Sequence, residues 1–225
     1  INDSPVARLG ASSPICASDS VYVTDTSSVG TGTISNWRYD FGDGNIINRT
    51  TNTPFYHHYT IPGTYTIKLV VNSNLSCKSD TSYRIITVNP APIAKFGYSG
   101  NICVTDSIQL TDTSSVSPGT ITNWEWNFGD GNSQIRTNGN AFWHQYTTTG
   151  NFTVTLVAVS SNGCKSDTAK RVVSVNTRPS ATLTSTGIPC VDSVRLFTSS
   201  FATGATPATW YWSFGDGQTA SSSTS

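Results

Sequence analysis

The fold is decided by the stretch Asn36-Trp37-Arg38-Tyr39-Asp40-Phe41-Gly42-Asp43-Gly44, which recurs in altered form at residues 123–131 and 209–217. Large aromatic residues stand at every second position, so their rings share one face of a β-strand while the residues between them mostly face water. Gly-Asp-Gly then reverses the chain, because glycine accepts a positive φ and an Asp side chain can bond its own backbone. Each stretch is therefore predicted to be a core strand that ends in a turn.

The composition favours strands and gives no sign of a nucleic-acid or membrane partner. Six Trp, nine Tyr and nine Phe supply a core, and Met is absent. Val, Ile and Thr are abundant, which favours strands. Thirteen basic residues balance thirteen acidic ones, so the net charge does not indicate binding to nucleic acid or to an anionic membrane. No apolar run approaches the roughly 20 residues of a membrane span, and Ile1 is interpreted as a cut or processed end, since no signal peptide precedes it.

The chain repeats itself with a step of 87 residues. Cys16, Cys103 and Cys190 are separated by this step, and so are many aromatic, proline and histidine positions. A step of that length is too long for a solenoid unit and fits a whole small domain, so the sequence predicts a tandem array. The predicted domains are residues 1–89, residues 90–176, and the N-terminal part of a truncated third domain in residues 177–225.

One repeat reads as about seven short strands with turn signals between them. In the first repeat the expected strands are residues 5–9, 20–24, 36–41, 64–71 and 81–88, with short edge strands within residues 45–55. So many short strands in under ninety residues predict an all-β fold, a two-sheet sandwich of immunoglobulin-like architecture. The third copy stops before its last two strands and cannot close a sandwich from these residues alone.

The order of the motifs resembles the PKD (polycystic kidney disease) domain. In the first repeat, Gly-Asp-Gly is followed by His57-x-Tyr59 and then by Gly63-x-Tyr-Thr-Ile, and the second repeat keeps the same order. Phe-Gly-Asp-Gly alone is a weak signal, whereas this succession, repeated in register, is specific. The residues that carry the resemblance are Trp37, Phe41, Gly42, Asp43, Gly44, His57, Tyr59, Gly63, Trp124, Trp126, Phe128, Gly129, Asp130, Gly131, His144, Tyr146, Gly150, Trp212, Phe214, Gly215, Asp216 and Gly217.

The resemblance implies extracellular, non-catalytic modules that serve as spacers or interaction modules in surface proteins and secreted hydrolases. The Cys-bearing form with many Ser, Thr and Asn residues resembles the long repeat adhesins of Bacteroidota surfaces. It implies a stalk or adhesin shaft with further PKD-like repeats and a protein or glycan ligand at a distal part of the full chain. Short linkers with proline, residues 88–92 and 175–179, favour stiff joints between the domains. The alternative is an accessory protein- or carbohydrate-binding module of a secreted hydrolase.

A sugar site is the minority interpretation. Trp143 stands where Tyr56 stands in the first copy, and Tyr211 has the outward register of its strand. Exposed aromatic residues can stack on sugars, but scattered ones are ordinary on protein surfaces. The repeats contain no repeated aromatic platform.

An enzyme is the least favoured class, because no catalytic constellation recurs. Glu125 is the only glutamate, which rules out a repeated Glu-based acid/base pair. Asp43, Asp130 and Asp216 lie between glycines after a strand, so they are interpreted as turn caps and not as nucleophiles. No nucleophile-elbow or phosphate-binding pattern is present.

The histidines are interpreted as packed or hydrogen-bonded residues and not as metal ligands. His57 and His58 are adjacent, yet no Cys or acidic residue recurs beside them, and Gln145 replaces the second histidine in the next copy. Calcium is the metal to consider, because some PKD domains resemble calcium-binding modules. It is disfavoured here, because a hard cation takes six to eight oxygens and the loop of residues 112–120 holds a single carboxylate. No cofactor is therefore predicted, and Asp25 and Asp112 are expected to bond nearby backbone amides.

The cysteines are predicted to form one disulfide in each full copy. Cys16 and Cys77 are 61 residues apart, and so are Cys103 and Cys164. A neutral, strand-built chain rich in Ser and Thr suits an oxidising compartment, where such pairs become disulfides. Buried free thiols are the alternative. Cys190 is expected to be unpaired, because its partner should lie at about residue 250, beyond this chain.

Four hydroxyl residues match the Asp-Ser/Thr-aliphatic pattern that resembles Bacteroidota O-glycosylation. They are Ser20, Ser107, Thr168 and Ser193, three of which take the same place in successive repeats. The alternative is a turn Asp followed by the start of a strand, since so short a pattern arises by chance.

Overall fold

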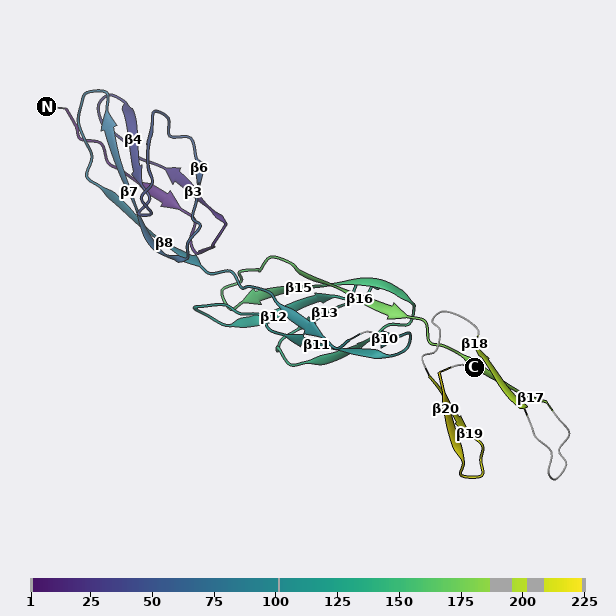
Figure 1. Ribbon diagram of the computed structural model, residues 1–225. Helices are drawn as coiled ribbons and strands as arrows, with labels where there is room; N and C mark the ends of the chain where they lie inside the picture. Colours follow the sequence, from purple (N-terminus) through teal and green to yellow (C-terminus); the bar gives the residue numbers. More distant parts are fainter. Residues whose placement is uncertain (1, 101, 187–195, 202–208, 224–225) are drawn as a thin grey trace. The chain divides into compact units, whose positions relative to one another are not determined.

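The computed structural model describes residues 2–100, 102–186, 196–201 and 209–223 of the chain, and within these ranges all regular structure is β-strand (Figure 1). The predicted all-β class is confirmed. Because the strands are short and alternate between buried and exposed positions, each sheet has one face that can pack on another sheet.

The first copy consists of a three-stranded and a five-stranded sheet. The three-stranded sheet has the order β1 (Leu9–Ala11), β3 (Ser20–Asp25), β6 (Phe55–His58). The five-stranded sheet has the order β2 (Ile15–Cys16), β8 (Ser82–Asn89), β7 (Gly63–Ser73), β4 (Ile34–Asp40), β5 (Ile46–Arg49). All pairs are antiparallel except β2 and β8, which run parallel.

The second copy repeats this topology strand for strand. Its three-stranded sheet has the order β14 (Phe142–Gln145), β11 (Ser107–Asp112), β9 (Phe96–Tyr98). Its five-stranded sheet has the order β10 (Ile102–Cys103), β16 (Ala169–Asn176), β15 (Gly150–Ser160), β12 (Ile121–Asn127), β13 (Ser133–Arg136). The parallel pair is again the one between the second strand and the last strand of the copy, β10 and β16.

Two antiparallel strand pairs follow the second copy. The first pair is β17 (Ala181–Thr186) with β18 (Leu196–Phe201), and the second is β19 (Trp210–Ser213) with β20 (Thr219–Ser222). Phe214 is 45% exposed, whereas its counterpart Phe41 is fully buried in the first copy. That residues 177–225 begin a third domain stays a prediction.

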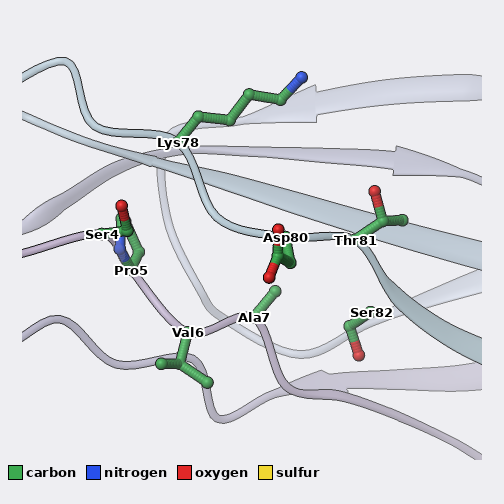
Figure 2. Close-up of a pocket in the computed structure, with 8 residues that line it drawn as sticks. All are labelled: Ser4, Pro5, Val6, Ala7, Lys78, Asp80, Thr81 and Ser82. Atoms are coloured by element: carbon green, nitrogen blue, oxygen red, sulfur yellow. The ribbon is translucent and has the colours of Figure 1, made fainter.

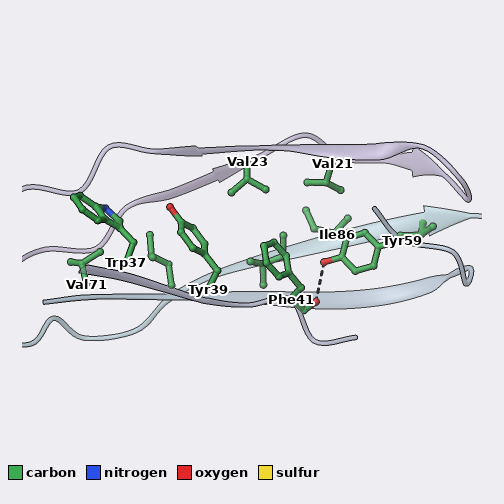
Figure 3. Close-up of a cluster of buried hydrophobic side chains, with 11 residues drawn as sticks. Val21, Val23, Trp37, Tyr39, Phe41, Tyr59, Val71 and Ile86 are labelled. Carbon is green, nitrogen blue, oxygen red and sulfur yellow. Dashed lines mark hydrogen bonds between the residues drawn. The ribbon is translucent and has the colours of Figure 1, made fainter. Parts of the chain in front are cut away.

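The aromatic strand of the first copy supplies the centre of its core, as its period of two predicts. Trp37 and Tyr39 of β4 are buried, and so is Phe41, which directly follows the strand (Figure 3). They lie in one cluster with Val21 and Val23 of β3, which is in the other sheet. Full burial of one such apolar side chain contributes about 1.5–3 kcal/mol, so this face holds the two sheets together.

Two strands of the first copy were not predicted from the sequence. β2 contains only Ile15 and Cys16, which is too short for a periodic pattern. β6 has the burial alternation of a strand, with Phe55 and His57 turned inward and Tyr56 and His58 outward. The remaining predicted strands are present with shifted ends, and the first begins at Leu9 instead of residue 5.

Candidate functional site

The Gly-Asp-Gly turn of the first copy is held by the Asp43 carboxylate. Oδ1 of Asp43 accepts a hydrogen bond from the backbone N–H of Asn45 at 2.9 Å, which confirms the predicted turn cap. Oδ2 accepts the side-chain amide of Asn45 at 3.0 Å and lies 2.8 Å from Nε2 of His57. The structure thus joins two motif residues that the sequence pattern alone does not connect.

The His57 ring is packed between aromatic residues. It stacks on Phe41 with ring centroids 3.7 Å apart, and it meets Tyr59 edge to face at 4.8 Å. The Tyr59 hydroxyl donates to the backbone carbonyl of Phe41 at 2.9 Å, a bond drawn in Figure 3. The prediction that this histidine is packed and hydrogen-bonded is confirmed.

The second copy reproduces the same arrangement. Asp130 Oδ2 lies 2.8 Å from Nε2 of His144, whose ring stacks on Phe128 at 3.8 Å. The Tyr146 hydroxyl donates to the Phe128 carbonyl at 3.0 Å. In both copies the Asp precedes the His by 14 residues, and this repeated spacing is the signal that could have revealed the pair.

The two turn carboxyls are ionised at neutral pH. Burial raises the pKa of Asp43, but the hydrogen bonds from Asn45 and His57 outweigh it, so the pKa falls below its ordinary value. The same balance lowers the pKa of Asp130. A carboxylate that is ionised at neutral pH has no proton to donate there as a general acid.

Asp25 also has both carboxylate oxygens occupied. Oδ1 accepts the backbone N–H of Ser27 at 3.2 Å and the Ser27 hydroxyl, and Oδ2 accepts the indole N–H of Trp37 at 2.8 Å. The expected backbone bond is confirmed for this Asp. Across the described residues no three His, Cys, Asp or Glu side chains are grouped to hold a metal ion. The absence of a cofactor stays a prediction.

A surface pocket of about 320 Å³ lies between the segment of residues 4–7, which precedes β1, and the segment of residues 78–82, which leads into β8 (Figure 2). Its lining residues are Ser4, Pro5, Val6, Ala7, Lys78, Asp80, Thr81 and Ser82. The Lys78 side chain extends away from Ser4 and Pro5 in Figure 2. This lining offers one carboxylate, one lysine amine and several hydroxyls, and it contains no His or Cys.

The exposed aromatic side chains lie where the sequence predicted them. Tyr56 is 69% exposed and lies against Tyr22 across the β3–β6 pair, with ring centroids 5.1 Å apart. Trp143 is also exposed but has Gln109 opposite it, so the pair is not repeated. Tyr211 is exposed too.

The hydroxyls of the possible glycosylation pattern are accessible where they are described. Ser20, Ser107 and Thr168 are exposed, and Ser193 lies outside the described residues. Their modification stays a prediction.

The predicted cysteine pairing is wrong. Cys16 is bonded to Cys164, 148 residues away, and Cys77 and Cys103 are free thiols. Both bonded cysteines belong to one compact unit made of Ile1–Ala94, Ser114–Trp124 and Val157–Asp167. Cys190 lies outside the described residues, so its state stays a prediction.

Strand β8 explains why a copy cannot bond its own two cysteines. Cys16 pairs with Asn89 at the end of β8, whereas Cys77 precedes Ser82 at the beginning of β8. An eight-residue strand spans roughly 25 Å, and a disulfide needs Cα atoms within about 7 Å. The two cysteines of one copy therefore lie at opposite ends of the sheet.

The fold and these contacts define a tandem array of immunoglobulin-like β-sandwiches. The PKD domain family matches residues 2–88 and again residues 89–175. The chain belongs to the PKD domain family, whose members are typically non-catalytic modules of extracellular proteins. Among the described residues, no helix is long and apolar enough to cross a membrane.

Solved structures with a similar chain path include two PKD domains. The PKD1 domain of Epp from Vibrio anguillarum is 26% identical, with 40% of this chain and 99% of that chain covered and a TM-score of 0.35. The PKD1 domain of the Vibrio cholerae metalloprotease PrtV is 30% identical, with coverage of 38% and 96% and a TM-score of 0.33. The fibronectin(III)-like modules of Clostridium thermocellum CbhA are 16% identical, with coverage of 75% and 94% and a TM-score of 0.39.

Proposed function

We propose that this chain is a segment of a non-catalytic extracellular repeat array that acts as the stalk or shaft of a bacterial cell-surface adhesin. The observation that carries the proposal is the repetition itself: two PKD domains of identical strand order follow each other without an inserted segment. A binding module needs one good surface, whereas a spacer gains length from each added copy.

The linker supports this function. β8 ends at Asn89, and Ile93 already forms a bridge with Ser115 of the second copy, so three residues lie between the two paired positions. Two of them are Pro90 and Pro92, which fix φ and favour extended geometry in the residues before them. A linker this short and this rich in proline has little conformational freedom compared with a Gly/Ser tether.

The disulfide supports the extracellular location. Disulfides persist in oxidising compartments and are rare in the reducing cytosol. The bond between Cys16 and Cys164 is therefore what we expect of a chain exported from the cell. Its removal by reduction also provides a variable for the test that follows.

Solution scattering on residues 1–176 tests the shaft. The sample is measured oxidised and reduced, each with the native linker and with Pro90 and Pro92 replaced by glycine. We expect an elongated particle with a narrow range of inter-domain angles in the native oxidised sample, and a broader range when both restraints are removed. A compact or freely jointed native sample would contradict the shaft.

Replacement in the intact adhesin separates spacer from binding module. The array is exchanged for an unrelated rigid segment of equal length, and cell adhesion is measured. A spacer role predicts that adhesion is retained, and deletion without replacement should reduce it. Loss of adhesion on exchange would favour the accessory module, for which the exposed Tyr22–Tyr56 pair is the available contact surface.

A further inference from the structure

We propose that Cys103 and Cys77 are each one half of a disulfide to a neighbouring copy of this domain, of the same kind as the bond between Cys16 and Cys164. Each copy would then use its first cysteine to bond the following copy and its second to bond the preceding one. The partner is another copy of the repeat. This bond pattern does not depend on the adhesin role proposed above or on any ligand that the full protein binds.

The sequence separations between the cysteines agree with this pattern of bonds between successive copies. The 148 residues between Cys16 and Cys164 are one 87-residue step plus the 61 residues that separate the two cysteines of a copy. A bond from the first cysteine of one copy to the second cysteine of the next therefore recurs at every step of the array. In this chain the rule leaves only Cys77 and Cys103 of the two full copies without a described partner, and these are the two free thiols.

Cys103 is held in the same backbone frame as the bonded Cys16. Cys16 pairs with Asn89 on the parallel β2–β8 edge, and Cys103 pairs with Asn176 on the parallel β10–β16 edge. The next residue after each cysteine donates its N–H to that same Asn carbonyl, at 2.7 Å in the first copy and 2.8 Å in the second. Both cysteines thus lie where the last strand of their copy ends.

A local turn fixes the first cysteine of each copy further. The N–H of Cys16 donates to Asp19 Oδ2 at 3.3 Å, and the N–H of Cys103 donates to Asp106 Oδ2 at 3.0 Å. Each Asp in turn donates its own N–H to the cysteine carbonyl at 3.0 Å. The free thiol is therefore placed by the same contacts that place the bonded one.

Cys77 is likewise held in the same frame as the bonded Cys164. Its N–H donates to Ser73 Oγ at 3.2 Å, and the N–H of Cys164 donates to Ser160 Oγ at 3.2 Å. The two serines donate their N–H groups to the cysteine carbonyls at 2.8 Å and 2.9 Å. Cys164 is fully buried in its bond, whereas Cys77 is only partly buried and accessible to a partner.

The loop that carries the second cysteine contacts the first residue of the family match to its copy, which is Asn2 for the first copy and Asn89 for the second. Asn162, two residues before Cys164, donates its side-chain amide to Oδ1 of Asn89 at 3.2 Å. In the first copy the thiol of Cys77 lies 4.0 Å from the carbonyl of Asn2, the counterpart of Asn89. The second cysteine therefore lies at the entry end of its copy, next to where a preceding copy would end.

The bond chemistry needs an oxidant of the dithiol–disulfide class. Two thiols lose two protons and two electrons as the S–S bond forms, and a disulfide oxidoreductase is reduced to its dithiol form. The exchange proceeds through a mixed disulfide, attacked by the thiolate of the second cysteine. The oxidant that produces the Cys16–Cys164 bond serves for every further bond, so no additional co-reactant is required.

Duplication of the two copies in register tests the proposal. Both matched domains complete their two sheets within residues 2–175, so these residues are repeated head to tail and exported to an oxidising compartment. Cys103 of the first half and Cys77 of the second half are then again 148 residues apart, as in the observed bond. Disulfides are mapped by non-reducing digestion and mass spectrometry, and free thiols are counted by alkylation.

We expect Cys16–Cys164 in both halves, one Cys103–Cys77 cross-link, and two free thiols in each molecule. Cys103→Ser in the first half should remove the cross-link and raise the free thiols to three, whereas the same substitution in the second half should keep the cross-link and lower them to one. Bonds within a copy, or four free thiols with no cross-link, would overturn the proposal.

Discussion

Nε2 of His57 lies 2.8 Å from Oδ2 of Asp43, and this contact joins the turn at the end of β4 to strand β6. β4 belongs to the five-stranded sheet and β6 to the three-stranded sheet, so the contact spans the two layers of the sandwich. Asp43 and His57 therefore have a structural role in this copy, because their contact links one sheet to the other.

The stability of both copies should fall on acidification because of Asp43 and Asp130. Their folded pKa values are lowered, so the stabilisation is present above the ordinary Asp pKa of about 4 and is lost as pH falls through the folded values. Urea midpoints measured from pH 7 down to pH 2 should drop in the acid range. The double variant Asp43→Asn, Asp130→Asn should show a shallower drop, and an unchanged profile would contradict this role.

Replacement of His57 by alanine should destabilise the first copy by about 2–4 kcal/mol, because it leaves a cavity beneath Phe41 and removes the partner of Asp43. His58→Ala is the matched control, since that ring is exposed and a change within about 0.5 kcal/mol is expected. Hydrogen exchange of β7 peptides reports the first copy, and β15 peptides serve as an internal reference. Equal effects of the two substitutions would contradict the packing role.

The two glycines of the first turn should differ in their tolerance of alanine. Both have a positive φ, which costs an alanine roughly 1–2 kcal/mol. A Cβ on Gly42 would also lie 3.0 Å from the backbone oxygen of Thr66, whereas a Cβ on Gly44 meets nothing within 4 Å. Thermal unfolding should therefore show a larger loss for Gly42→Ala than for Gly44→Ala. The reverse order would show that the close approach of the turn at Gly42 to Thr66 of β7 does not limit the substitution.

Removal of calcium should leave the melting temperature unchanged. The carboxylate oxygens of Asp25 accept hydrogen bonds from Ser27 and Trp37, and this leaves too few charged oxygens to bind a hard cation. Differential scanning calorimetry with a chelator, and then with excess calcium, measures the effect. A rise in melting temperature with calcium that saturates would establish a site.

The core could be predicted from the sequence because it follows from period alone. Trp37, Tyr39 and Phe41 stand two residues apart, and a strand must place them on one face. The strand at His57 was not predicted because its inward residues are an aromatic and a histidine, and a histidine is not expected in a core. The Asp43 hydrogen bond and the packing on Phe41 and Tyr59, which make its burial favourable, come from other parts of the chain.

The cysteine pairing could not be predicted because equivalent cysteines of successive copies cannot be told apart by sequence spacing. Cys77 and Cys164 occupy the same position in successive copies, so the spacing alone makes either of them a possible partner of Cys16. Only the position of Cys16 beside Asn89, at the far end of β8 from Cys77, decides between them.

The parallel pairing of β2 with β8 determines how one copy would carry tension. A pull between the ends of a copy acts in opposite directions along these two strands, so the hydrogen bonds around Ile15–Val88 and Cys16–Asn89 are loaded together in shear. Bonds loaded together resist more force than bonds opened one after another. In the oxidised chain the Cys16–Cys164 bond carries the load past these strands, so the reduced chain is the one to stretch. We expect single-molecule stretching of the reduced chain to show high, repeated unfolding peaks, and a copy that opens gradually at low force would contradict this.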